Sequence, residues 1–433
     1  MSSATSGPGH RLASGAVGQA TARRAPTTPR ILEVDALRGF ALGGILLANV
    51  LVMAGPFALT GGRPEETGAD LIAHWLVAAL VESKFYLLFS FLFGYSFTLQ
   101  TSSAERAGAS FERRMLRRLL ALFVLGVTHA VLLYSGDILT TYAVLGLVLF
   151  ASRRASPERV WRAALWLYGV IAVLLLLVAA ASATVPASEF GTAAEAQAEA
   201  HALTEAYRGG LADVVAANIR ALPELLLGTL VAGGHVVTAF LVGFVAGRRR
   251  SLAGNVSASR LRRSCVIGGV VGVPGGVLMA LGTVGPLSDQ WEVPAFVLGL
   301  VAAPALSVAY ASGLLLWFRT ARGARVASWL APAGRMALTN YLLQSLVMAL
   351  VFYGYGLGLY GRTGAAAAVC GALVLYVTQS YVSARLMRRF RYGPVEWVLR
   401  AVTVAGRPGE DGGVRKPLGL RDAASPAAGE VRE

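Results

Sequence analysis

The chain has 433 residues, of which 55% are hydrophobic and only 15% charged, and its mean hydropathy is +0.59. Because a soluble domain carries about a quarter of charged residues, this composition indicates a membrane protein. The net charge of +15 does not indicate nucleic-acid binding, because the basic residues form short clusters between apolar runs instead of covering one solvated face. Cys265 and Cys370 lack any paired spacing, which excludes a disulfide framework or a zinc site.

Ten segments are long and apolar enough to cross a hydrocarbon core, which takes roughly twenty residues. In chain order they cover about 36–56, 79–100, 116–134, 137–151, 161–184, 222–247, 264–285, 293–318, 332–353 and 364–386. The fourth is short and is predicted to tilt. The sequence therefore predicts an all-α, polytopic membrane helix bundle over residues 31–400, with about ten transmembrane helices. Residues 1–30 and 401–433 are polar or rich in small residues and are predicted to be a disordered leader and tail.

The loops between these segments alternate in charge. Arginines gather in the leader and after every second segment, whereas acidic residues gather in the loops between, including the longest loop, 185–221. The positive-inside rule then places both termini in the cytoplasm. Within the long outer loop, the stretch from Asp213 to Leu222 is amphipathic enough to predict a helix that rests on the membrane interface.

Two charges stand at the start of the first segment. Asp35 and Arg38 are three residues apart and so share one helix face. One interpretation is an ion pair at the membrane interface that marks the orientation of the helix. The other is that Arg38 presents its guanidinium to a phosphate-bearing ligand at the cytoplasmic mouth.

Two further charges lie in the outer half of the second segment. Glu82 and Lys84 are two residues apart, so on a continuous helix they point to different faces and need partners on other segments. His129 and Asp137 are expected at a similar depth. Glu82 and Lys84 either line an outward-facing polar path for a substrate or extend toward the outer interface.

Several runs resemble a known family. The runs RILEVDALRGFALGGILLAN, ESKFYLLFSFLFGYSF, HAVLLYSGDIL, GRMALTNYLLQS and FRYGPVEWVLR, in this order, resemble the YeiB family of bacterial membrane proteins, also described as domain of unknown function 418. The resemblance covers about residues 30–400 and implies a multi-pass protein of the bacterial plasma membrane. The activity of that family is largely unassigned.

The D-x-L-R-G opening is also similar, more distantly, to that of two families of membrane-bound acyltransferases. In the acyltransferase-three family a catalytic His follows the Arg by eleven residues, and Asn49 holds that position here. In the heparan-glucosaminide acetyltransferase family an Asn holds it and the catalytic His comes eleven residues later, where this chain has Thr60. The resemblance therefore implies that the first segment starts as in an acyltransferase, but that another residue serves as the base. Asn49 stays a candidate on the substrate path.

His129 is the candidate for that base. It lies in the third segment, and Asp137 follows eight residues later, just past the Ser135-Gly136 break. If the break folds Asp137 back, its carboxylate would fix the imidazole tautomer, as a general base requires. The alternative is that His129 bonds to a neighbouring helix while Asp137 caps the fourth segment.

Two amides follow in the ninth segment. Asn340 and Gln344 are four residues apart and share one face. Amides in this position either join membrane helices or line a polar path. His235, in the sixth segment, is a lone imidazole that fits packing or a proton relay.

Three functions remain open at this point. The first is an acyltransferase that moves an acyl group from a cytoplasmic donor such as acyl-CoA, held near Arg38 and Asp35, to a hydroxyl or amine of a small-molecule or glycan acceptor near His129. The second is a transporter or exporter of a small or amphipathic metabolite, with Glu82, Lys84, Asn340 and Gln344 along its path. The third is an accessory protein that holds partners through its basic loops.

Overall fold

The computed structural model describes residues 32–56, 68–106, 110–185, 192–252 and 256–404. The predicted leader lies outside these residues, as does the predicted tail except Ala401–Val404, which end a helix. The described elements are α1 (Leu32–Ala54), α3 (Gly68–Leu80), α4 (Lys84–Arg106), α5 (Phe111–Leu132), α6 (Leu139–Ser152), α7 (Pro157–Ser182), α8 (Ala193–Arg208), α9 (Leu211–Arg248), α10 (Ala258–Thr283), η2 (Asp289–Trp291), α11 (Glu292–Trp317), α12 (Ala321–Arg335), α13 (Ala337–Phe352), α14 (Ala365–Arg389) and α15 (Pro394–Val404).

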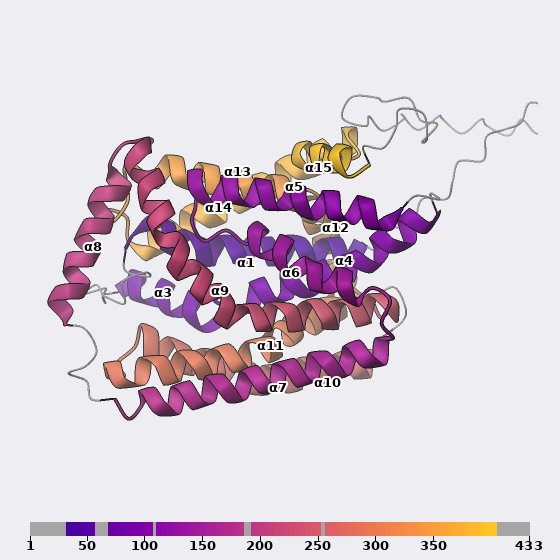
Figure 1. Cartoon of the computed structure of the whole chain (residues 1–433), viewed down its shortest axis with the longest axis horizontal. Coiled ribbons are helices and arrows are strands. Elements are labelled where there is room, and N and C mark those ends of the chain that lie inside the picture. Colours follow the sequence, from indigo (N-terminus) through magenta and orange to yellow (C-terminus); the bar gives the residue numbers. More distant parts are fainter. Residues whose placement is uncertain (1–31, 57–67, 107–109, 186–191, 253–255, 405–433) are drawn as a thin grey trace, which may run out of the picture. The chain divides into compact units, whose positions relative to one another are not determined.

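The described chain is helical, with no strand among the residues the structure covers (Figure 1). Seven helices are long and apolar enough to span a membrane, and α12 with α13 makes an eighth if the bent pair counts as one span. Two predicted segments, 137–151 and 222–247, correspond to α6 and to α9, whose apolar part Gly233–Arg248 is short like α6. The prediction of an all-α, multi-pass membrane bundle is confirmed.

One end of the bundle gathers arginines. Arg153 bonds to Glu112, Arg248 donates to the Arg153 carbonyl, and Arg249 lies 3.5 Å from Glu158. The starts of α5 and α7 and the ends of α6 and α9 therefore meet there (Figure 1). We call this the basic end. Its charge agrees with the alternation in the sequence, while its placement in the cytoplasm stays a prediction.

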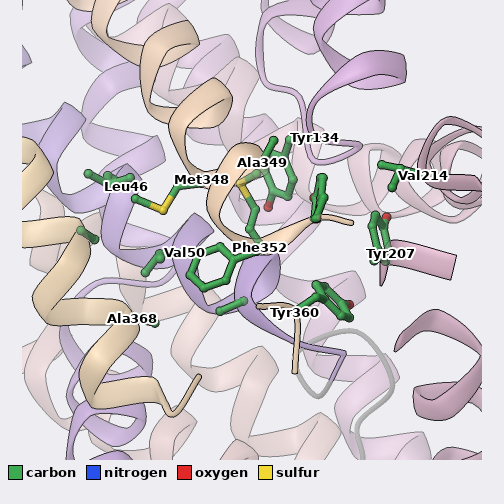
Figure 2. Packing of buried hydrophobic residues seen from close by; sticks show 14 of the residues in the cluster. Leu46, Val50, Tyr134, Tyr207, Val214, Met348, Ala349, Phe352, Tyr360 and Ala368 are labelled. Atoms are coloured by element: carbon green, nitrogen blue, oxygen red, sulfur yellow. The ribbon is translucent and has the colours of Figure 1, made fainter. Parts of the chain in front are cut away.

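The opposite end, beside α8, is closed by an aromatic cluster. Tyr207 of α8 stacks against Tyr360 at 4.9 Å and lies 4.8 Å from Tyr353, between ring centroids. Figure 2 shows Tyr207 and Tyr360 in one cluster with Tyr134 and with Phe352 of α13, and Tyr353 belongs to the same cluster. The cluster ties α8 to the loop after α13 and to the turn between α5 and α6.

Helix α1 lies among α4, α12, α13 and α14 and approaches α12 most closely. A methyl group at Gly39 would overlap the Leu330 carbonyl of α12, and one at Gly334 would overlap the Asp35 carbonyl of α1. Two glycines therefore allow the backbones of α1 and α12 to touch.

Two predicted spans are broken in the structure. The span expected at 79–100 starts earlier, at Gly68, and its helix is interrupted at Val81–Ser83, where Ser83 has a φ of +66°. The span expected at 332–353 consists of α12 and α13, which meet at Met336 with a bend of 76°. Apolar composition cannot reveal these breaks, because the mean hydropathy of a segment is the same whether its helix is straight or broken.

The stretch from Asp213 to Leu222, predicted as a helix on the membrane interface, is helical but is not separate from the next apolar segment. Its place at the interface stays a prediction. Helix α9 begins at Leu211 and runs to Arg248 without interruption, so these residues form its first turns. Asp213 accepts the Gly210 N–H at 2.9 Å and so starts the helix before the apolar stretch. Pro223 removes a single backbone donor, which a long packed helix tolerates.

The start of α8 supports a prediction about pH. Glu195 accepts the Thr192 N–H at 2.7 Å, and this bond holds the pKa of its carboxyl below the ordinary value of 4.5. The stabilisation is therefore present above pH 4.5 and is lost as the pH falls through the lowered pKa. We expect hydrogen exchange, corrected for its intrinsic pH dependence, to show the first turn of α8 opening in that acidic range. Glu195→Ala, which removes the acceptor, should open it already at neutral pH, whereas Glu199→Ala should not.

Candidate functional site

A buried pair of titratable side chains lies where α5 turns into α6. Asp137 Oδ1 is 2.9 Å from His129 Nδ1, and the two side chains are only 2% and 1% exposed. The contact is electrostatic, because the ring N–H is not aligned with the oxygen. The predicted return of Asp137 to His129 is thus confirmed, while the role of the pair stays a prediction. We call these two residues the dyad.

The same carboxylate also caps α6. Asp137 Oδ2 accepts the Thr140 N–H at 2.6 Å, so one oxygen faces the imidazole and the other the helix. Asp137 thus faces the imidazole and also caps α6, whereas the bond from His129 to a neighbouring helix, which the second interpretation expected, is not formed by the residues that the structure describes. Gly126 of α5 makes room for this arrangement, because a methyl group there would come within 2.6 Å of Asp137 Oδ2 and 2.5 Å of the Thr140 nitrogen.

Tyr341 of α13 covers one face of the imidazole. The centroids of the Tyr341 and His129 rings are 5.0 Å apart, and the Tyr341 hydroxyl lies 3.4 Å from the Ile138 N–H beside Asp137. Tyr134, a member of the aromatic cluster, presents its ring edge at 6.4 Å. Tyr341 was not among the residues predicted for the site, although the run TNYLLQ places it between the two amides that were.

The second ring nitrogen of His129 is left without a bonding partner in the described part of the chain. His129 Nε2 is buried and has no hydrogen-bond partner among the residues that the structure describes. A buried polar atom without a partner is costly and uncommon. The dyad therefore combines an imidazole that faces a carboxylate with a second ring nitrogen that no described residue bonds.

Arg38 lies at the basic end of α1 and makes the predicted pair. Its Nη1 is 2.6 Å from Asp35 Oδ1, and its Nη2 donates to the Ser96 hydroxyl of α4. The Arg38 side chain keeps 21% of its surface exposed. Arg118 of α5 lies within electrostatic reach of Arg38 and of Glu396, so two guanidinium groups are close together here. Binding of a phosphate at this place stays a prediction.

The amides of α13 bond to α14. Asn340 donates to the Ser383 hydroxyl at 2.9 Å, and Gln344 donates to Gln379 Oε1 at 2.9 Å. Both amide side chains are buried, at 3% exposure. They therefore join the two helices, and their place along a substrate path stays a prediction.

Lys84 lies at the break between α3 and α4. Its side chain is fully buried, and its ammonium donates to the Ala78 carbonyl at 2.8 Å and lies 3.4 Å from Met279 Sδ. It thereby satisfies a carbonyl at the end of α3, as basic residues do at helix C-termini. Its bonds do not include either member of the dyad.

Glu82 lies inside the same break and is half-buried, within electrostatic reach of Lys84 and of His74. The expected convergence of Glu82 and Lys84 with the dyad is not seen among the described contacts, because Lys84 bonds within the break and the charges near Glu82 are Lys84 and His74. Asn49 is half-buried in α1, whereas Thr60 lies outside the described residues. Across the described ranges, no three His, Cys, Asp or Glu side chains gather as metal ligands would.

The chain has relatives over nearly its whole length. It is 32% identical over 395 residues to the uncharacterized protein YxaH of Bacillus subtilis (strain 168), covering 87% of this chain and 95% of the relative. Residues 246–406 match the family model described as "Protein of unknown function (DUF418)". The chain belongs to the YeiB family of DUF418 proteins.

Two further relatives agree with this membership. The uncharacterized protein YeiB of Escherichia coli (strain K12) is 30% identical over 404 residues, covering 87% of this chain and 96% of the relative. An uncharacterized 39.9 kDa protein from the amylase 3′ region of Bacillus acidopullulyticus is 29% identical over 383 residues, covering 86% of this chain and 94% of the relative. The names of these relatives state no activity, so the function of this member must be argued from its site.

Proposed function

We propose that this YeiB-family protein is a membrane-embedded acyltransferase, which moves an acyl group from a thioester donor to a hydroxyl or amine of a small-molecule or glycan acceptor. The observation that carries the proposal is the dyad: a buried imidazole, faced by Asp137 through Nδ1 and open at Nε2. The likeness of the D-x-L-R-G opening to membrane-bound acyltransferases supports the same chemistry.

The dyad can carry the proton through a balanced reaction. His129 Nε2 accepts the proton of the acceptor's O–H or N–H group as that atom attacks the acyl carbon. The bond from the acceptor to the acyl carbon forms, the thioester C–S bond breaks, and the thiolate leaves with the proton returned from the imidazolium. Asp137 stabilises the imidazolium between these two steps.

The basic end suits a donor that carries phosphates. We place this end in the cytoplasm of a bacterial cell and the bundle in its plasma membrane, where acyl-CoA would approach Arg38 and Arg118. Arg38 already spans α1 and α4 through Asp35 and Ser96. A donor phosphate would meet two guanidinium groups, whose charge-assisted bonds are stronger than neutral ones.

Donor binding tests this proposal. We expect Arg38→Ala to weaken acyl-CoA binding about 10- to 100-fold, because one charged hydrogen bond contributes about 1.5–3 kcal/mol. The measurement is saturation binding of radiolabelled acetyl-CoA and palmitoyl-CoA to the purified protein in nanodiscs. Arg154→Ala is the matched control, because Arg154 is also at the basic end but 83% exposed. No saturable binding by folded wild-type protein, or equal weakening in both variants, would contradict the proposal.

A second candidate function is transport of a small or amphipathic metabolite. The two broken spans favour it, because discontinuous helices often form the substrate sites of transporters. Glu82 and Lys84 lie at one break, and Asn340 and Gln344 follow the other. Proteoliposomes separate the two functions: a transported substrate accumulates unchanged, whereas an acyltransferase releases an acylated product and free thiol.

A further inference from the structure

Helix α13 begins without a cap from its own neighbourhood. It starts directly after the bend at Met336, whose side chain makes no capping bond. The first backbone donors of a helix need such an acceptor. They find it in Glu396 of α15, which accepts the N–H groups of Leu338 at 2.8 Å and Thr339 at 3.0 Å.

Glu396 and α13 are joined by more than this cap. The Thr339 hydroxyl donates to Glu396 Oε2 at 2.5 Å and accepts the Val395 N–H at 3.1 Å. A methyl group at Gly393, just before α15, would overlap Glu396 Oε2, so the entry to α15 is tightly packed. The first turns of α13 and α15 therefore hold one another in a single arrangement.

The capped turn leads directly to the dyad. Tyr341 comes two residues after Thr339 and lies against the His129 ring. Leu399, one turn along α15 from Glu396, is buried in the same apolar cluster as Tyr341 and Leu139 of α6. A shift of the α13 start would thus displace the ring that covers the imidazole.

We propose that Glu396 is a positioning residue for His129. By capping α13 from α15, it sets the place of Tyr341 and so the orientation of the imidazole. The link between Glu396 and His129 is structural and independent of the reaction, whereas its effect on turnover rests on the proposed acyltransferase function.

Two readouts test the proposal. In protein labelled with ¹⁵N-histidine, Glu396→Ala should change the side-chain ¹⁵N signals of His129, which report the ring proton and its surroundings. Acyl transfer should fall about 10- to 100-fold in kcat, with the KM for the donor unchanged, because misplacing a reacting group by about 1 Å costs that much. Glu396→Gln keeps one acceptor oxygen on a side chain of the same shape. This variant should therefore fold and show smaller changes in the His129 signals and in kcat than Glu396→Ala.

Matched variants separate positioning from general stability. Glu158→Ala removes an exposed carboxylate at the basic end that contacts Arg249, and should alter neither readout. Tyr341→Leu should reproduce the His129 signals of Glu396→Ala, and the double variant should add nothing further, because both act through one contact. Tyr341→Phe keeps the ring and should stay close to wild type in the His129 signals.

The outcomes for the two proposals are distinguishable. Altered His129 signals in Glu396→Ala, with no acyl transfer by wild type, would support the positioning role and contradict the acyltransferase function. Unchanged His129 signals in folded Glu396→Ala and Glu396→Gln would overturn the positioning role, whatever the activity of the wild type.

Discussion

Replacing His129 by glutamine is expected to lower the rate of acyl transfer about 10²- to 10⁴-fold, because the protein loses the group that takes the proton from the acceptor. Glutamine fills much of the same volume but cannot accept and return a proton at neutral pH. The measurement is the single-turnover rate of product formation from labelled acetyl-CoA in nanodiscs. Donor binding should survive, because His129 is on α5 far along the helix from Arg118 and the basic end.

Asp137→Asn should lower the rate of acyl transfer by a similar factor, but for a different reason. The amide oxygen can still accept the Thr140 N–H and cap α6, so the turn should keep its shape. The amide nitrogen then faces His129 Nδ1 as a donor, which moves the ring proton to Nε2 and removes the acceptor that catalysis needs. Because the two residues act as a unit, the double variant should lose little more than His129→Gln alone.

His235→Gln is the matched control for the loss of a buried histidine. His235 is 1% exposed in α9, and its ring lies edge-on to Tyr168 at 5.9 Å. His235→Gln should lower the free energy of unfolding without lowering the single-turnover rate of the folded protein. If His129→Gln retained as much activity as His235→Gln, His129 would have no part in the mechanism.

Adding one methyl group at Gly334 is expected to destabilise the bundle by about 3 kcal/mol, at the upper end for overpacked cores. The new carbon would overlap the Asp35 carbonyl and lie 2.7 Å from the Gly39 nitrogen. Both obstacles are backbone atoms of α1, which cannot rotate away, so α1 and α12 must separate. Because Asp35 moves with that carbonyl, donor binding at Arg38 should weaken as well. The measurement is the free energy of unfolding in mixed micelles.

Gly269→Ala in α10 and Gly371→Ala in α14 are the controls for Gly334→Ala. A methyl group at either position meets nothing within 4 Å. These variants should be neutral or stabilise by about 0.4–1 kcal/mol, because alanine restricts the unfolded chain more than glycine. Equal stability of Gly334→Ala and Gly269→Ala would show that α1 and α12 do not touch at this crossing.

The sequence by itself determined the features that depend on composition and on short spacing. Hydropathy predicted the membrane bundle and the approximate place of most apolar segments, though not helix α3, because the cost of burying a residue in lipid is a property of that residue. The Asp35–Arg38 pair followed from a spacing of three on one helix. The dyad could also be expected, since His129 and Asp137 flank one short turn and need no distant element to meet.

Only the tertiary structure decided which distant groups complete the site. Tyr341 reaches His129 from α13, and Glu396 caps α13 from α15, contacts that no local pattern contains. The break at Val81–Ser83 likewise depends on outside acceptors and donors: Lys84 turns back to the Ala78 carbonyl, and Tyr310 of α11 donates to the Leu80 carbonyl. A helix in a membrane can break only where other side chains satisfy the freed backbone groups. Those side chains come from elsewhere in the chain, so the breaks and the geometry that they produce appear only when the helices are packed.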